Sequence, residues 1–307
     1  MSWSLRILGT NAAVPANGRF PSAQVLDTLH ALFLIDCGEG TQMRLSDYHV
    51  KRSRIQRIFI SHLHGDHFFG LPGLITSYGL FGRKDPLVIH GPYGIHDILV
   101  KVIEVTNINL NYDLIIEEHD SSAPAVIVED QYLCVSTIPL KHRVPTTGYI
   151  FREKVMPRSI NRDGVQKFEI PFQDFEDLQH GKDWKSPDGR IISNSLLTHP
   201  GRMPCSFAYC SDTAYFPEII EHVKDVSVLY HESTFLDDLR EKAERRGHAT
   251  AMQAAEVAEK ANAKLLILGH FSSRYQDVSV FEKEASRYFP NVIAAREGMT
   301  IELDQNL

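Results

Sequence analysis

Three apolar runs that lie far apart in the sequence each end beside a side chain that can bind a metal. The runs that end at residues 60, 210 and 268 lead to His62, Asp212 and His270. Such short runs, rich in aliphatic and β-branched residues, predict strands. The ends of different strands can meet at one edge of a sheet. This pattern constrains the chain to a fold in which a sheet edge carries a cluster of ligands.

The first of these runs leads into a dense group of ligand-capable side chains, "SHLHGDHFFG" at 61–70. His62 and His64 are two residues apart at the end of a strand, so their rings point the same way. The loop that follows can turn Asp66 and His67 toward a second ion. Zinc accepts imidazole nitrogen and carboxylate oxygen as ligands. Since packing and solubility give no reason for such a cluster, we interpret it as a metal site.

Two ions need more ligands than one short motif supplies. The stretch "STIPLKH" at 136–142 brings another histidine, His142, to the end of a predicted strand. We therefore expect His142, Asp212 and His270 to complete the site. A carboxylate can bridge two metals, and this role suits Asp212.

Length and composition indicate a globular protein with one large core. The chain has 307 residues with no linker rich in Gly, Ser and Pro, which predicts one domain over 1–307. Its net charge of −7 argues against general binding of polyanions, so any nucleic-acid surface must be local. No apolar run reaches the ~20 residues that span a membrane. The four cysteines form no C-x-x-C pair, and we expect a cytoplasmic protein with reduced thiols.

The order of the predicted elements indicates a mixed α/β chain with layered sheets. Strands are expected at 5–9, 23–27, 31–36, 55–61, 87–91, 126–130, 132–140, 206–211, 226–233 and 263–270. Apolar residues at helical spacing predict helices at 41–48, 94–106, 218–223, 251–261 and 280–289. The first half is richer in strands, whereas strands and helices alternate in the second.

The segment 151–193 interrupts the predicted sheet core. Connections longer than ~15 residues are uncommon and often functional, so we expect a flexible arm with a structured tip. The alternating "KFEIPF" at 167–172 predicts a short strand, and "QDFEDLQHG" at 173–181 predicts a brief helix that ends at Gly181. From Arg152 to Arg190 eight basic residues face eight acidic ones, so the arm has no net positive field.

The motifs of this chain resemble those of the metallo-β-lactamase superfamily, and most closely those of its ribonuclease Z branch, the tRNA 3′-processing endonucleases. The similar stretches follow the family's order along nearly the whole chain: "LGTNAAVP", "DCGEGTQ", "SHLHGDHFFGLPGL", "SDT", "HESTF", "GHAT" and "LGHFSSRYQD". The histidine motif marks the superfamily, whereas its "GLPGL" extension, "HESTF" and "SSRYQ" mark the branch. The resemblance implies a four-layer αββα sandwich with two zinc ions at one edge.

The resemblance also implies which residues bind the metals. One zinc ion would take His62, His64 and His142, and the other Asp66, His67 and His270. Asp212 would bridge the two ions, and Asp66 would in addition accept a proton. Asp36 is expected to organise the site without binding metal.

Further roles follow for residues outside the ligand set. His248 is implied as the proton donor to the leaving 3′-oxygen, and Glu232 as the carboxylate that orients it. Thr250 and Gln253 match a capping box, which places His248 on a constrained loop just before a helix. Arg274 is a candidate for contacting the scissile phosphate through its planar guanidinium.

Two loops depart from the family pattern. The early loop "PANGRF" at 15–20 keeps Pro15 and Arg19 but has Asn17 and Phe20 where the family usually carries lysine and asparagine. The family's "HST" reads "HAT" here, so Ala249 lacks a hydroxyl. The early loop is associated in the family with reading the tRNA end.

These observations predict a zinc-dependent endoribonuclease that hydrolyses a phosphodiester bond and removes the 3′ trailer from precursor tRNA. The tRNA would keep a 3′-hydroxyl, and the trailer would carry a 5′-phosphate. The family further suggests a homodimer, in which the arm of one subunit holds tRNA for the site of the other. Neither DNA nor a membrane is expected as a partner.

Three other functions are compatible with the same ligand set. A small-molecule metallohydrolase of the same fold, such as a thioesterase, lactonase or cyclic phosphodiesterase, needs no device for holding a large RNA. An iron protein of oxygen chemistry would contain two iron ions in place of zinc. A non-catalytic binding protein would not need the intact ligand set. For the arm, the alternative is a role in dimerisation.

Overall fold

The chain divides into two compact units in the computed structural model, which describes residues 2–303. Within the described residues, the larger, called the core unit here, comprises 2–129, 134–152 and 205–303, and the smaller, called the arm unit, comprises 130–133 and 153–204. Residues 1 and 304–307 of the predicted domain 1–307 lie outside the described residues.

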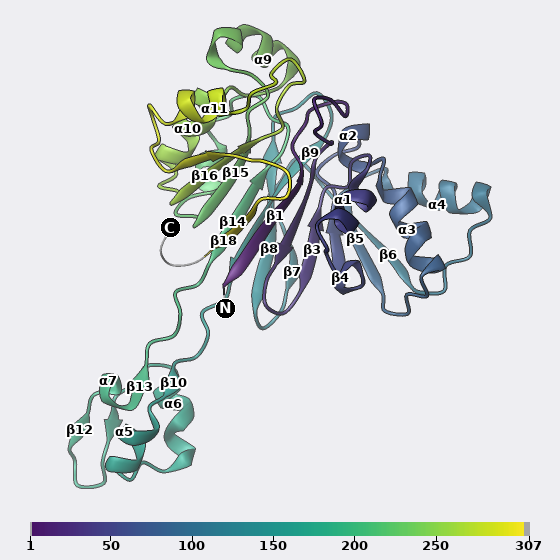
Figure 1. The fold of residues 1–307 in the computed structure, drawn as a ribbon. Coiled ribbons are helices and arrows are strands. Elements are labelled where there is room, and N and C mark those ends of the chain that lie inside the picture. The colour runs from purple at the N-terminus through teal and green to yellow at the C-terminus, as the bar shows by residue number, and fades with distance from the viewer. Residues whose placement is uncertain (1, 304–307) are drawn as a thin grey trace. The chain divides into compact units, whose positions relative to one another are not determined.

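Two seven-stranded sheets form the centre of the core unit (Figure 1). The first has the order β18-β1-β2-β3-β4-β5-β6, with bounds Thr300–Leu303, Trp3–Gly9, Ala23–Asp27, Leu32–Ile35, Ile55–Phe59, Leu87–Pro92 and Leu114–His119. The second has the order β17-β16-β15-β14-β9-β8-β7, with bounds Val292–Ala294, Leu265–Gly269, Val228–Glu232, Ser206–Cys210, Thr146–Glu153, Leu133–Leu140 and Val126–Glu129. In both sheets antiparallel strands continue into four parallel ones, β3 to β6 and β14 to β17.

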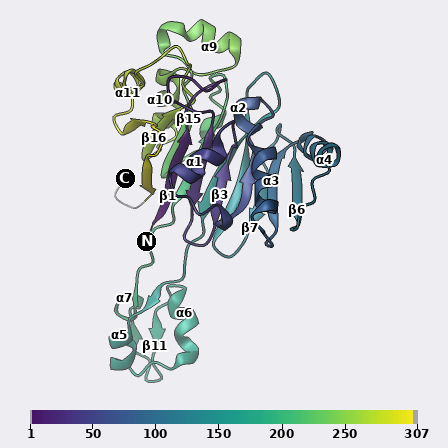
Figure 2. The same ribbon diagram turned by 45° about the vertical axis from the view of Figure 1, so that its right-hand side comes forward.

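Helices cover the outer face of each sheet, as Figure 2 shows for the first sheet. On the first sheet they are α1 (Thr41–Asp47), α3 (Leu71–Leu80) and α4 (Ile95–Thr106), and on the second α8 (Ile219–His222), α10 (Ala251–Lys260) and α11 (Ser279–Ala285). The buried side chains of the helices on each sheet pack against that sheet, so each sheet and its helices form one apolar cluster. Within residues 2–303 no helix has the length and apolar character needed to cross a membrane.

The inner faces of the two sheets meet through aromatic side chains. The ring centroid of Phe59 in β4 lies 5.2 Å from that of Tyr149 and 5.1 Å from that of Phe151, both in β9. Phe33 in β3 also contacts Phe151, at 5.8 Å. Because side chains alternate along a strand, Ile58 points to the helix side while Phe59 points inward. The resulting four-layer αββα arrangement confirms the predicted fold class.

The arm unit has a small apolar core of its own. Its helices are α5 (Arg162–Lys167), α6 (Phe175–Gln179) and α7 (Asn194–Leu197). Two short ribbons accompany them, β10 with β13 (Ser159–Ile160, Thr198–His199) and β11 with β12 (Trp184–Lys185, Ile191–Ile192). Buried side chains from these elements and their connections form the core: Val165, Ile170, Leu178 and Leu197. The segment is therefore a folded unit, and its helix at 175–179 confirms the one predicted at 173–181.

One local prediction for this segment is wrong. No strand forms at 167–172, because α5 extends to Lys167 and Glu169 adopts a left-handed backbone with φ 53°. Phe172 is 83% exposed, so the alternation that suggested a strand does not mark a buried face. The predicted bounds 151–193 also differ from those of the unit, because Phe151 and Arg152 still pair within the core sheet and the arm unit continues to residue 204.

Candidate metal centre

All the predicted metal ligands lie together at one end of the core unit. The first sheet supplies four, from the end of β4 and from the short helix α2 (Gly65–Phe68). The second sheet supplies three, from the residues that follow β8, β14 and β16. Their ligand atoms form two groups, each with all its ligand atoms within 4.8 Å of one another: His62, His64, His142 and Asp212 in one, and Asp66, His67 and His270 in the other.

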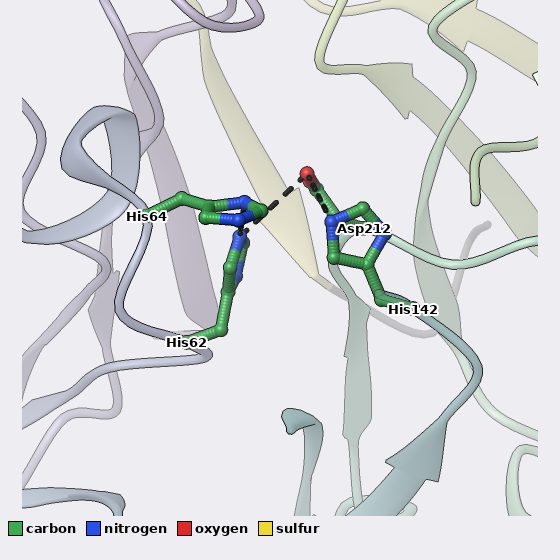
Figure 3. Close-up of side chains that lie close together, drawn as sticks. All are labelled: His62, His64, His142 and Asp212. Atoms are coloured by element: carbon green, nitrogen blue, oxygen red, sulfur yellow. Dashed lines mark hydrogen bonds and ion pairs between the residues drawn. The ribbon is translucent and has the colours of Figure 1, made fainter. Parts of the chain in front are cut away.

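Asp212 lies between the two groups. Its Oδ1 is 3.3 Å from Nε2 of His67 and 3.2 Å from Nε2 of His270. Its Oδ2 is 3.7 Å from Nε2 of His62 and 3.8 Å from Nε2 of His142, and Figure 3 shows this side of the carboxylate. Each oxygen thus faces a different group, as a bridging carboxylate requires.

The histidines are oriented by hydrogen bonds at their outer ring nitrogens. Nδ1 of His142 lies 2.7 Å from the carbonyl oxygen of Gly247, so it must donate and leave Nε2 with a lone pair. Nδ1 of His270 lies 2.9 Å from Oγ1 of Thr234, whose own hydroxyl donates to Glu232. His270 therefore also presents an unprotonated Nε2 to the centre. Such outer partners fix the tautomer of metal-binding histidines.

Two buried polar atoms at the centre fit a metal better than they fit the protein around them. Nε2 of His142 and Oδ1 of Asp212 have no hydrogen-bond partner among residues 2–303. An unpaired buried polar atom costs about 1–3 kcal/mol. A divalent cation would bind both atoms, and a set of imidazole and carboxylate donors suits zinc. The residues present therefore fit a divalent metal.

The electrostatics of the centre favour the protonation states that metal binding needs at the two carboxylates and at His62. Burial alone would raise the pKa of Asp66 and of Asp212, but the facing histidines outweigh it and hold both values below the usual range. Burial also lowers the pKa of His62 well below its ordinary value. The carboxylates are therefore charged and His62 is neutral at neutral pH, as metal ligands must be. At His67 burial is outweighed by the facing carboxylates, which raise the pKa well above its ordinary value, so this ring must lose a proton when a metal binds.

Asp36 holds the ligands of the first sheet in place, and it joins the two sheets. It is fully buried and adopts a left-handed backbone with φ 54°. Its carboxylate accepts hydrogen bonds from the backbone and hydroxyl of Ser61 at 2.8 and 2.9 Å. It also contacts Nδ1 of His67 at 2.7 Å and accepts from the hydroxyl of Tyr209, in the second sheet, at 2.6 Å. This arrangement agrees with the predicted organising role.

The early loop at 10–20 positions Asp66 through its backbone. The N–H of Ala13 donates to Oδ2 of Asp66 at 2.7 Å. Arg19 ties this loop to the opposite side of the site by donating to the carbonyl oxygen of Tyr275 at 2.7 Å. Gly38 faces the backbone of Asp66 so closely that a Cβ there would lie 2.4 Å from its carbonyl oxygen. Gly38, the first glycine of "DCGEG", thus permits this close approach.

His248 lies beside the two ligand groups and is held by Glu232. Its Nδ1 is 2.9 Å from Oε1 of the buried Glu232. Burial opposes the charged form, but the carboxylate outweighs it and raises the pKa of His248 to about 9. The loop is fixed by the predicted capping box between Thr250 and Gln253 at the start of α10. Ala249, which lacks the family hydroxyl, donates its backbone N–H to Glu232.

His248 also falls into a third possible ligand group with Asp212 and His270. Its Nδ1 is already engaged by Glu232, and a protonated ring cannot bind a metal. The contact of Nδ1 with Glu232 therefore argues against His248 as a metal ligand. The centre opens into a cavity of about 390 Å³, lined by His248 and by the predicted Arg274.

Sequence reasoning missed the hydroxyl groups that orient the ligands. The hydroxyl of Ser61 donates to Asp36, and that of Thr234 contacts His270. The hydroxyl of Tyr209, in β14, also donates to Asp36. Serine, threonine and tyrosine are too common for their spacing to stand out. The one available signal is adjacency, because Ser61 directly precedes His62.

Known proteins resemble this chain over nearly its whole length. A family model described as beta-lactamase superfamily domain matches residues 177–271, and one described as Anti-Pycsar protein Apyc1 matches residues 3–99. The ribonuclease Z of Bacteroides fragilis is 44% identical over 301 residues, which cover 98% of this chain and 99% of that protein. The chain belongs to the ribonuclease Z family. The ribonuclease Z of Porphyromonas gingivalis is 43% identical and also covers 98% of the chain.

Solved structures agree with membership of the ribonuclease Z family. Human tRNase Z, short form, has a TM-score of 0.71 and 28% identity, covering 98% of this chain and 99% of that one. The metallo-beta-lactamase fold protein YhfI from Bacillus subtilis, at 18% identity, shares the fold with a TM-score of 0.68. Family membership and the two ligand groups together indicate a divalent-metal enzyme.

Proposed function

We infer that this chain is an endoribonuclease that removes the 3′ trailer from precursor tRNA, using two zinc ions. The observation that carries the inference is 44% identity to a ribonuclease Z over 98% of the chain. Both ligand groups are complete in this chain, which supports the same conclusion. The small-molecule hydrolase is not favoured, since the similarity extends to whole ribonuclease Z chains. Precursor tRNA would be met in the cytoplasm.

The proposed ligand sets are those of the two geometric groups: His62, His64 and His142 for one zinc, Asp66, His67 and His270 for the other, with Asp212 between them. Bound zinc lowers the pKa of water to about 7 and so supplies hydroxide at neutral pH. The contacts of Asp66 with Ala13, His67 and His270 all use Oδ2, which leaves Oδ1 to accept a proton.

His248 is proposed to protonate the leaving 3′-oxygen. Because Nδ1 is bound to Glu232, the proton available to the substrate is the one on Nε2. Glu232 stabilises the charged ring and keeps it oriented, and the raised pKa of His248 keeps that proton in place at neutral pH. The products of cleavage are a tRNA that ends in a 3′-hydroxyl and a trailer that begins with a 5′-phosphate.

Replacing His248 by alanine is expected to slow cleavage of precursor tRNA by about 10²–10⁴-fold, the usual contribution of general-acid catalysis. The loss should be much smaller for bis-p-nitrophenyl phosphate, because nitrophenolate leaves without protonation. Rates on both substrates and the metal content of the variant are measured together. Equal losses on the two substrates, or loss of bound metal, would contradict the proton-donor role.

Metal analysis of the purified protein is expected to give two zinc ions per chain, whereas the oxygen-chemistry alternative predicts two iron ions. Removing the metal with a chelator should lower the melting temperature by about 10 °C, since a ligand at 1,000 times its Kd stabilises by about 4 kcal/mol. Adding zinc should restore the melting temperature. A melting curve that a chelator leaves unchanged would argue against a resident metal.

The arm unit is proposed to bind tRNA in a homodimer, in which the arm unit of one subunit holds tRNA for the metal centre of the other. Its eight basic and eight acidic residues between 153 and 204 exclude a simple positive surface. The apolar core of the arm unit supports the proposal instead, because it makes the arm a folded unit and not an irregular loop. The alternative remains a dimerisation arm.

A further inference from the structure

Four cations line the cavity at the metal centre: Arg143, Lys242, Arg246 and Arg274. For none of them do residues 2–303 provide a carboxylate within ion-pair distance. Arg240 lies in the same helix as Lys242, α9 (Arg240–Arg246), and it does pair with Asp237, at 2.9 Å. Unpaired cations that gather at a cavity in a chain of net charge −7 indicate a site for an anionic ligand.

Two of these cations contact the same aromatic ring. Nζ of Lys242 lies 5.7 Å from the ring centroid of Phe235, and Cζ of Arg274 lies 5.6 Å from it. Both distances are within the range of cation–π contacts. The two side chains come from different elements, α9 and the loop before α11. Partial burial lowers the pKa of Lys242, and the charge of Arg274 adds to this effect.

The position of this pair relative to His248 suggests which anion it binds. Phe235 is 3% exposed, and its ring centroid lies 6.3 Å from that of His248. In the proposed function His248 protonates the leaving 3′-oxygen, so the nucleotide that keeps this oxygen lies beside His248. The next anion on that side of the RNA is the 5′-phosphate of the same nucleotide.

We propose that Lys242 and Arg274, held over Phe235, bind the 5′-phosphate of the nucleotide whose 3′-oxygen is released. This nucleotide becomes the 3′ end of the mature tRNA, and the inference rests on the proposed function. The sequence predicts Arg274 at the scissile phosphate, whereas its contact with Phe235 assigns it to the neighbouring one. A substrate with a single phosphate leaves this subsite empty.

Adenosine 5′-monophosphate carries a free 3′-hydroxyl and a 5′-phosphate, and it therefore mimics this nucleotide. Its inhibition constant is measured against hydrolysis of bis-p-nitrophenyl phosphate, beside those of adenosine and inorganic phosphate. We expect adenosine to inhibit at least about tenfold more weakly than its monophosphate. In Lys242→Ala and in Arg274→Ala the constant for the monophosphate should rise about tenfold, whereas that for inorganic phosphate, which binds at the metals, should not.

For each variant we compare the ratio of two inhibition constants, that of adenosine 5′-monophosphate and that of inorganic phosphate. This ratio does not depend on the variant's basal rate. Lys242→Arg should restore the wild-type ratio. Arg245→Ala is the matched control, because Arg245 lies in the same helix but outside the cavity lining, and its ratio should stay unchanged. An unchanged ratio in both alanine variants at 242 and 274, or an equal rise for both inhibitors, would overturn the subsite.

Calorimetric titration gives the same binding constants without turnover. If the protein hydrolysed no phosphodiester, the proposed function would fail, but the ratio could still be measured. If hydrolysis were normal and the ratio did not change, only the subsite would fail. The two failures are therefore distinguishable.

Discussion

Alanine at Asp66 or at His67 is expected to abolish cleavage of both precursor tRNA and bis-p-nitrophenyl phosphate. Loss of a residue that only orients a metal ligand costs about 10–100-fold, so loss of a ligand should exceed about 100-fold. Nε2 of His67 lies 3.3 Å from Oδ1 of Asp212 and 3.5 Å from Oδ2 of Asp66, so its removal takes a contact away from both carboxylates. Rates on both substrates and zinc content per chain test the expectation.

Two further variants calibrate this result. His96→Ala removes an exposed histidine outside the ligand groups and should leave both rates unchanged. Asp36→Asn keeps the ligands but weakens the acceptor of His67, and it should cost about 10–100-fold. Near-normal hydrolysis of the small ester by the Asp66 or His67 variant would refute the assignment of that residue as a ligand.

Replacing residues 155–203 by a short Gly/Ser linker is expected to lower kcat/KM for precursor tRNA by at least about 100-fold, equivalent to about 2.7 kcal/mol. If the arm unit is an exosite, a tRNA-binding surface apart from the metal centre, it supplies binding energy for tRNA, whereas the small ester needs only the metal centre. The design is feasible because Arg152 and Ser206 are directly paired across antiparallel strands, so a few residues can close the connection. Hydrolysis of bis-p-nitrophenyl phosphate should persist.

The same linker variant separates the exosite from a dimerisation arm. Sedimentation analysis of the wild-type protein and of the variant reports whether each is a dimer, and a direct binding assay reports the variant's affinity for precursor tRNA. A variant that stays dimeric but no longer binds precursor tRNA agrees with the exosite. Wild-type cleavage of precursor tRNA without the arm would contradict it, and a monomer that still binds tRNA would favour the dimerisation role.

The ligand cluster was readable from the sequence because four of its members follow apolar strands: His62, His142, Asp212 and His270. His62, Asp212 and His270 come from strands in two sheets, and the structure brings them to one end of the core unit. A strand delivers its end residue to a sheet edge whatever the connection between strands, so convergence could be expected without knowing the topology. Their roles as ligands remain predictions.

Other parts of the fold could not be read in this way. The strand β6 has exposed residues on both faces, and its apolar run is limited to the three residues 114–116, which is too short to predict a strand. Helix α3 contains Pro72, Gly73 and Gly79, which sequence rules associate with turns, yet tertiary packing stabilises it. The pairing of Arg6 in β1 with Thr300 in β18 depends on tertiary structure, because no local pattern links residues so far apart.

The division of the ligands between two sheets has a consequence during synthesis of the protein. The histidines and aspartate of the first sheet leave the ribosome early, but His270 follows only after about 200 further residues, and the strand that closes the first sheet at 300–303 later still. Until then the growing chain holds an incomplete set of ligands. An RNA-cleaving enzyme made in this order has no complete metal centre beside the messenger and transfer RNAs that surround it until both of its sheets have been synthesised.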